Sequence, residues 1–231
     1  MPGCPLTAVV GRRKVLIVLG ETTTSWQAKR REGTRQEILS AAWAVAREHG
    51  LAALTLREVA ARVGMRAPSL YSHFDSKHAI YDAMFEQAWS EYEELARESD
   101  ATVPAEPRAA LRYLAWRFFD FSLADLARHQ LMNVRTIPDF TPSAESYAPA
   151  VRVLDALHVR LAAIGITDGA DIDLFVALVG GLIDHQWAND PGGTRWARLI
   201  DRAVDMYADA LHLPRSDISS SDESATDQEE R

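Results

Sequence analysis

The sequence predicts an all-α protein of about nine helices, arranged as a small N-terminal three-helix domain and a larger C-terminal helical bundle. Residues that favour helices, such as Ala, Leu, Arg and Glu, are abundant, whereas Gly and Pro number only 12 and 10 in 231 residues. Apolar residues recur at helical spacing, and no segment shows a convincing strand pattern. We place the small domain at residues 34–79 and the larger one at residues 80–213.

The first predicted helix begins at Thr34. Thr34 and Glu37 have the spacing of a capping box, in which the hydroxyl and the carboxylate satisfy backbone N–H groups at a helix start. Gly50 follows the last helical residue, where a left-handed glycine ends many helices. Residues 1–33 are strongly basic and show little periodicity, so we expect a flexible arm. This arm either adds phosphate contacts or is in part an over-long start of the chain.

Two short helices are predicted next, joined by a tight turn at Gly64. Thr55 and Glu58 form a second capping box. One face of the helix that they open is apolar: Leu56, Val59, Ala60 and Val63. Pro68 then occupies the first turn of a third helix, where its missing N–H costs nothing. The inward-facing residues of that helix are Leu70 and Phe74. Two short helices joined in this way form a helix-turn-helix.

A long helix from Ser76 is expected to connect the two domains. Beyond it, helical spacing predicts further helices at residues 107–123, 125–133, 145–164, 172–188 and 194–211. Proline- and glycine-rich segments at 137–142 and 189–193 mark loops between them. Residues 214–231 are rich in Ser, Asp and Glu and nearly free of apolar residues, so we expect a disordered acidic tail.

Charge is divided unevenly along the chain. The net charge is −8, yet residues 1–80 carry 12 Lys and Arg against 6 Asp and Glu, a net charge of +6, and the remainder carries 13 against 27, a net charge of −14. Because salt screens charges beyond about 8 to 10 Å, a phosphate backbone responds to local charge rather than to the total. The basic N-terminal part is therefore compatible with nucleic-acid binding.

A specific residue order accompanies the helix-turn-helix pattern. It comprises LTLREVAARVG at 54–64, APSLYSHF at 67–74 and the pair Ser76-Lys77. Over residues 34–80 the chain resembles the TetR family of bacterial regulators. The resemblance implies a homodimer on a palindromic double-stranded DNA operator, usually repression, and release of the DNA when a small molecule enters the C-terminal domain.

The third helix is the one expected to enter the major groove. Tyr71 and His73 should lie on its exposed side, Lys77 should contact phosphate, and Arg66 should read guanine. Many family members have a Ser or Thr cap where Arg66 stands, so we expect either a frayed helix start or unusual contacts by Ser69. The predicted DNA-binding residues are Thr55, Arg66, Ala67, Pro68, Ser69, Tyr71, Ser72, His73 and Lys77. For each of them the alternative is a solvated or capping side chain.

The larger domain carries two further candidate sites. The helix at 107–123 is apolar on nearly every side, which is typical of a helix that packs a core or lines a cavity. We expect a small, mostly apolar effector to bind there, with core packing as the alternative. The candidate ligand-binding residues are Trp116, Phe119, Met132, Tyr147, Phe175 and Trp187.

The last two helices each carry a broad apolar stripe, which suits a four-helix dimer interface. Gly180 and Gly181 would allow close approach of two backbones. The candidate interface residues are Phe175, Val179, Leu182, Ile183, Gln186, Leu199, Ile200, Ala203 and Tyr207. The alternative is that these stripes are buried within one subunit.

Residue types that catalyse reactions or bind metals do not gather at recognisable spacings. His129, His158 and His185 lack the spacing of metal ligands, and Asp184 beside His185 has no nucleophile or second carboxylate with it. We interpret Asp184 and His185 as a surface pair near a helix end. The sequence therefore predicts no enzyme activity, no catalytic residue, no cofactor and no metal. A small helical enzyme and an architectural or protein-interaction module are the alternative interpretations.

Two further features concern the compartment. The apolar runs at residues 15–19 and 172–183 are shorter than the about 20 residues that span a bilayer. Cys4 is the sole cysteine, so a disulfide within one chain is excluded. We therefore expect a cytoplasmic protein with no membrane partner.

Overall fold

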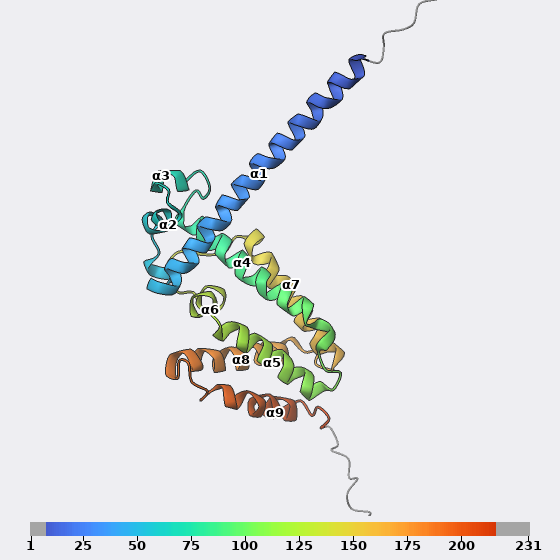
Figure 1. Cartoon of the computed structure of the whole chain (residues 1–231). Coiled ribbons are helices and arrows are strands. Elements are labelled where there is room, and N and C mark those ends of the chain that lie inside the picture. Colours follow the sequence, from blue (N-terminus) through green and yellow to red (C-terminus); the bar gives the residue numbers. More distant parts are fainter. Residues whose placement is uncertain (1–7, 216–231) are drawn as a thin grey trace, which may run out of the picture. The chain divides into compact units, whose positions relative to one another are not determined.

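A computed structural model describes residues 8–215, with side chains from residue 26 onward (Figure 1). Within that part the regular elements are nine α-helices and three short 3-10 helices, without a strand. The prediction of an all-α fold is thereby confirmed. The predictions for Cys4 and for nearly all of the acidic tail fall on residues 1–7 and 216–231, outside the described residues.

The first helix, α1 (Ala8–His49), is much longer than predicted. The expected start at Thr34 is wrong, because the Thr34 hydroxyl donates to the Arg30 carbonyl oxygen (3.1 Å), one helical turn earlier. A threonine hydroxyl can bond either way, so the capping-box pattern does not separate a helix start from a helix interior. Residues 8–33, expected to form a flexible arm, are therefore continuous with α1. The predicted end is confirmed, since Gly50 has φ 84° and its N–H donates to the Ala46 carbonyl (2.9 Å).

The helix-turn-helix forms as predicted, although its second helix is short. In α2 (Leu56–Val63), Thr55 Oγ1 accepts from the Glu58 N–H (3.2 Å) and Gly64 ends the helix with φ 74°. In α3 (Ala67–Leu70), only one turn is regular. The Ser72 hydroxyl donates to the Ser69 carbonyl (2.7 Å) and so competes with the backbone for the acceptor that a longer helix would use.

The N-terminal compact unit contains the described residues up to Met84 together with Arg135–Pro142. Its core joins α1, the short 3-10 helix η1 (Leu51–Ala53), α2, α3 and the first part of α4 (Lys77–Glu98). The fully or almost fully buried apolar side chains include Ile38, Ala42, Val45, Leu54, Val59, Leu70, Phe74, Ile80 and Tyr81. Helix α4 begins where predicted, because Ser76 Oγ accepts from the Ala79 N–H (3.0 Å).

The second compact unit runs from Phe85 to Val134 and from Ser143 onward, so α4 belongs to both units. After a 3-10 turn, η2 (Asp100–Thr102), its helices are α5 (Pro107–Leu123), α6 (Leu126–Asn133), α7 (Ala144–Ala163), α8 (Gly169–Asn189) and α9 (Ile200–Ala210). The predicted boundaries agree within about three residues, except for the last helix. There the 3-10 helix η3 (Ala197–Leu199) precedes α9, and the N–H groups of Trp196 and Ala197 donate to the Gln186 side chain (2.9 and 3.2 Å).

Helix α5 lies at the centre of this unit, as its apolar surface predicted. It packs against α6, α8 and α9, and its Leu111, Leu114 and Phe119 are buried. Burial of these side chains removes apolar surface from water, which stabilises the unit by roughly 25 cal/mol per Å². None of the helices searched in the described part is both long and apolar enough to cross a membrane.

Candidate DNA-binding site

The α3 segment presents a polar edge on an apolar base. Leu70 is fully buried and Phe74 nearly so, and both fix the segment to the core. Between and before them the side chains face solvent, and Tyr71 is 54% exposed. The other exposed residues of this edge are Arg66, Pro68, Ser69 and Ser72, whereas Ala67 is half-buried. This arrangement leaves donors and acceptors free to reach base edges or phosphates.

Two arginines of α1 hold the turn that follows α3. Arg35 Nη1 donates to the His73 carbonyl oxygen (2.6 Å), and Arg31 Nη2 donates to the Ser72 carbonyl oxygen (3.1 Å). The Arg35 guanidinium also lies 4.1 Å from the centroid of the Phe74 ring. Hydrogen bonds from charged donors are stronger than neutral ones, so the turn is well fixed. Sequence reasoning missed both residues, because they lie about 40 positions from their partners.

The histidine of the recognition segment is less accessible than predicted. His73 is half-buried, and its Nδ1 is buried without a hydrogen-bond partner among the described residues. An unpartnered buried nitrogen is costly in a folded protein. The predicted exposed placement therefore holds for Tyr71 and only in part for His73.

Lys77 lies beside the loop after α1. Its Nζ is 3.4 Å from the Ala52 carbonyl oxygen and 5.4 Å from the centroid of the Tyr81 ring. The Tyr81 hydroxyl donates to the Leu51 carbonyl oxygen (2.5 Å), and burial raises the pKa of Tyr81 to about 12. Lys77 and Tyr81 thus join η1 to the start of α4, and the phosphate contact of Lys77 stays a prediction.

The cations of α2 and α3 differ in their partners. Arg62 bonds to the Glu48 carboxylate, a contact that lowers the pKa of Glu48 and raises that of Arg62. In the described part of the chain, Arg57 and Arg66 form no ion pair. Thr55 is exposed at the α2 N-terminus, and its hydroxyl hydrogen is free to donate although its oxygen accepts from Glu58. Uncompensated positive charge therefore lies close to the recognition segment.

Comparison with known proteins identifies this arrangement. The family described as bacterial regulatory proteins, tetR family, matches residues 38–84, which include all of α2 and α3. Residues 38–84 of the chain thus carry the DNA-binding region of the TetR family. The recognition segment thus lies within the matched residues, and the resemblance inferred from the sequence is confirmed.

Two curated TetR-family relatives show how far the likeness extends. The transcriptional regulator AcrR of Shigella flexneri is 28% identical over 44% of this chain and 47% of its own length. The class A tetracycline repressor of Escherichia coli is 26% identical over 75% of this chain and 80% of its own length. The chain thus spans about half the length of the first relative and four fifths of the second. These relatives are transcription regulators, not enzymes.

A solved structure supports the fold. FadR from Bacillus subtilis, determined in complex with stearoyl-CoA, is 16% identical, has a TM-score of 0.56, and covers 74% of this chain and 96% of its own. At that identity the likeness shows the fold alone. In this fold a larger helical domain follows the helix-turn-helix that the family match covers.

The six ligand-binding candidates do not form one group. Phe119 and Phe175 are buried in the α5–α8–α9 core, and Trp116 and Trp187 pack against it. The polar ends of both tryptophans are used within the chain: Trp116 Nε1 donates to Asp201 (2.7 Å) and Trp187 Nε1 is 3.4 Å from the Ser122 carbonyl oxygen. These four residues therefore have an evident role in packing.

The other two ligand candidates lie apart from that core. Met132 is buried on α6. Tyr147 of α7 is 50% exposed and stacks on Phe85 of α4, with ring centroids 5.7 Å apart. Tyr147 is therefore the most accessible of the six.

The dimer candidates differ in how exposed they are within the chain. Six of them are buried inside the chain: Phe175, Val179, Ile183, Gln186, Ile200 and Tyr207. The other three, Leu182, Leu199 and Ala203, are half-buried. The apolar stripes of α8 and α9 face each other and α5, so the six buried side chains have packing partners within the chain.

One polar pair was misread from the sequence. His129 of α6 is almost fully buried, and its Nε2 lies 2.9 Å from Asp184 Oδ1 of α8. The predicted partner, His185, instead stacks on Trp196 with centroids 4.6 Å apart. Adjacent helical residues point in different directions, which is why Asp184 and His185 do not form a pair. Among the described residues, no group of three or more His, Cys, Asp or Glu could hold a metal ion.

Proposed function

We propose that this TetR-family regulator is a homodimeric repressor in the cytoplasm, which binds a palindromic operator through α2 and α3 and leaves it when a small apolar molecule binds the C-terminal domain. The observation that carries the proposal is the exposed edge of α3, seated on buried Leu70 and held by Arg31 and Arg35. A rigid, exposed segment with nearby positive charge is what reading of a DNA groove requires.

Roles within the recognition segment follow from exposure. Arg66 is exposed at the start of α3, without an ion pair in the described part of the chain, and can place its guanidinium against guanine. Ser69 and the backbone of Ala67 and Pro68 accompany it into the groove. Tyr71, Ser72 and His73 lie at the far end, where hydroxyl and imidazole groups suit phosphate contacts. Thr55 and Lys77 complete the phosphate contacts on either side.

The dimer proposal keeps α8 and α9 but changes the residues. The face of α8 turned away from its buried stripe carries Leu174, Ala177 and Gly181, and Leu174 is 57% exposed. On α9, Met206 is 63% exposed. A Cβ added at Gly180 or Gly181 meets nothing within 4 Å, so packing within the chain does not require either glycine. A second copy of this helix pair would use the small residues for close approach and bury both apolar side chains.

The effector proposal rests on a smaller set of residues than the sequence suggested. Tyr147 offers an exposed ring and hydroxyl over Phe85, and Trp89 and Phe118 stack nearby on α4 and α5, with centroids 6.4 Å apart. Rings with a few polar groups suit a mostly apolar ligand. FadR from Bacillus subtilis was solved with stearoyl-CoA, whose acyl chain is apolar although its coenzyme A part is charged. A tenfold loss of DNA affinity needs about 1.4 kcal/mol of differential binding by the effector.

Selection of duplexes from a random library by the purified protein tests this function. We expect one palindromic sequence to be enriched, and Arg66→Ala to relax preference at one position by about 1 to 3 kcal/mol. Lys77→Ala should weaken binding to every sequence alike and reduce the salt slope by roughly one. Failure to enrich any sequence, or loss of only non-specific affinity in both variants, would refute this assignment of the recognition residues.

A further inference from the structure

The N-terminal part of α1 carries positive charge that the helix-turn-helix does not use. All residues from 26 to 33 are exposed. Besides Arg31, which holds the turn after α3, they include Lys29 and Arg30 against the single acid Glu32. Glu32 accepts a hydrogen bond from Gln36 (2.8 Å) and is thereby directed along the helix. In the described part of the chain, neither Lys29 nor Arg30 forms an ion pair. Both cations are therefore available to an anionic partner.

An aromatic side chain accompanies these cations. Trp26 is 60% exposed, and the Arg30 guanidinium carbon lies 5.5 Å from the centroid of its ring. A cation–π contact between a guanidinium and an indole restricts the long arginine side chain before any partner binds, so less entropy is lost when a phosphate is bound. Residues Trp26, Lys29 and Arg30, which we call the α1 basic patch, thus combine free charge with partial preorganisation.

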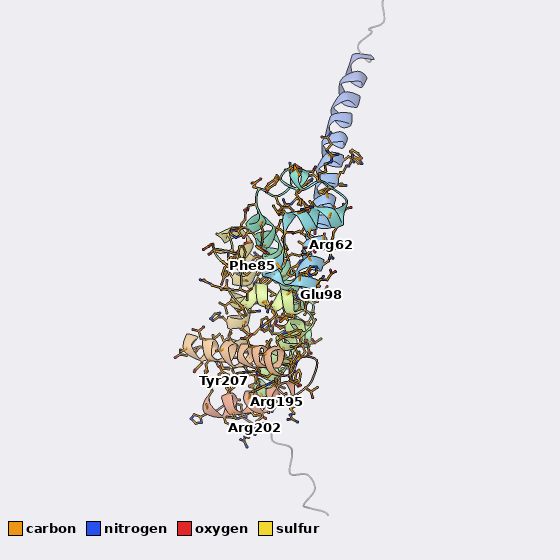
Figure 2. All side chains as sticks on the ribbon, turned by 90° about the vertical axis from the view of Figure 1, so that its left-hand side faces the viewer. Arg62, Phe85, Glu98, Arg195, Arg202 and Tyr207 are labelled. Carbon is orange, nitrogen blue, oxygen red and sulfur yellow. The ribbon has the colours of Figure 1, made fainter. Side chains whose placement is uncertain are left out.

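The α1 basic patch lies close to the recognition segment. Arg31, the next residue, donates to the carbonyl oxygen of Ser72 at the end of that segment. A helix rises 1.5 Å per residue, so Trp26 lies about 8 Å farther along the axis than Arg31. Figures 1 and 2 show that the N-terminal part of α1 extends well beyond α3. The sequence of this extension contains Arg12, Arg13 and Lys14 as well.

We propose that the α1 basic patch is a second DNA-contact surface, which binds the phosphates of the duplex that flanks the sequence read by α3. This proposal rests on the proposed operator binding. The contact is independent of base sequence, because it consists of two cations and an indole ring in contact with one of them, with no group fixed toward a base edge. It increases the length of duplex that the protein contacts, and it adds affinity because the contacted phosphates release counterions.

Two duplexes and two variants test it. Both duplexes carry the sequence that the wild-type protein selects from a random library, one ending at the selected sequence and one extended by about one helical turn on each side. The test variant is Lys29→Ala/Arg30→Ala, and the matched control, Arg195→Ala/Arg198→Ala, removes the same charge from two exposed positions of the other unit. Fluorescence anisotropy at several salt concentrations gives the affinity and the salt slope, and circular dichroism checks the fold.

The wild-type protein and the control should bind the extended duplex at least tenfold more tightly than the short one. The test variant should lose this advantage, and its salt slope on the extended duplex should fall by about two per protomer. Equal affinity of the wild-type protein for both duplexes, or an unchanged slope in the test variant, overturns the proposal while operator binding stands. Failure of the wild-type protein to select any sequence overturns the proposed function and this proposal with it.

Discussion

At the scale of single residues, Arg35 connects α1 to the turn after α3. Replacement by Ala removes a charged hydrogen bond to the His73 carbonyl and the contact with the Phe74 ring. We expect Arg35→Ala to lower the free energy of unfolding by about 2 kcal/mol, measured by urea denaturation, and to weaken operator binding. Arg57→Ala, at an exposed position of α2, should change stability by less than about 0.5 kcal/mol. Equal stability of the two variants would contradict this role.

The Glu48–Arg62 pair makes part of the stability depend on pH. The bond from Arg62 lowers the pKa of Glu48 below its ordinary 4.5. A carboxyl whose pKa is lower in the folded state stabilises the protein above its unfolded pKa, and this contribution is lost as pH falls through the folded value. Wild-type protein should therefore be more stable than Glu48→Gln near neutral pH, with the difference shrinking below about pH 4.5.

The control for this pH dependence is the partner itself. Unfolding measured across pH for Arg62→Gln and for the double variant Glu48→Gln/Arg62→Gln completes a double-mutant cycle. Without Arg62, replacement of Glu48 should change the pH dependence much less, because only the smaller attraction of His49 then lowers the pKa of Glu48. A difference of unchanged size in the Arg62→Gln background would assign the effect to another group.

At the scale of elements, two glycines of the N-terminal unit have opposite roles. Gly64 ends α2 with φ 74°, a backbone angle that residues other than glycine adopt only with strain. Gly33 lies inside α1, and a Cβ there meets nothing within 4 Å. Chemical denaturation should show Gly64→Ala less stable by roughly 1 to 2 kcal/mol and Gly33→Ala more stable by about 0.5 to 1 kcal/mol. A destabilising Gly33→Ala would contradict the continuity of α1 through this residue.

At the scale of the whole molecule, the exposed faces of α8 and α9 predict the assembly. Leu174→Asp/Met206→Asp places charges on both faces without touching the core. Sedimentation should show a folded monomer. Its operator affinity should be strongly reduced, because one protomer contacts only one half-site. Val159→Asp, at a 70% exposed position of α7, should remain a dimer. A double variant that is folded and still dimeric would place the interface elsewhere.

Regulation also involves the whole molecule. By thermodynamic linkage, the effector must weaken operator binding by the same factor by which the operator weakens effector binding. Tryptophan fluorescence titrated with a panel of apolar metabolites, with and without operator, should reveal a compound that binds the DNA complex more weakly. Tyr147→Ala should weaken binding of that compound at least tenfold, whereas Val159→Ala on the same helix should not. If a folded Tyr147→Ala protein bound the compound as tightly as the wild-type protein, the role of Tyr147 would be only to pack on Phe85.

The sequence by itself determined the features that depend on near neighbours. The Thr55 cap, the turn at Gly64 and the inward pair Leu70 and Phe74 all follow from spacing within one or two helical turns, and so does the family. The sequence also predicted an apolar α5 and stripes on α8 and α9. The same capping pattern failed at Thr34, because whether a helix continues depends on the residues before it as well as on the pattern itself.

Only the tertiary structure decided which partners those surfaces have. Periodicity shows that Phe175 and Val179 lie on an apolar face, but not whether α5 or a second subunit covers that face. The bonds of Arg31 and Arg35 to the recognition turn, and of His129 to Asp184, join residues 38 to 55 positions apart. Such pairs leave no local pattern, because the folding of the chain brings them together rather than the pitch of any one helix.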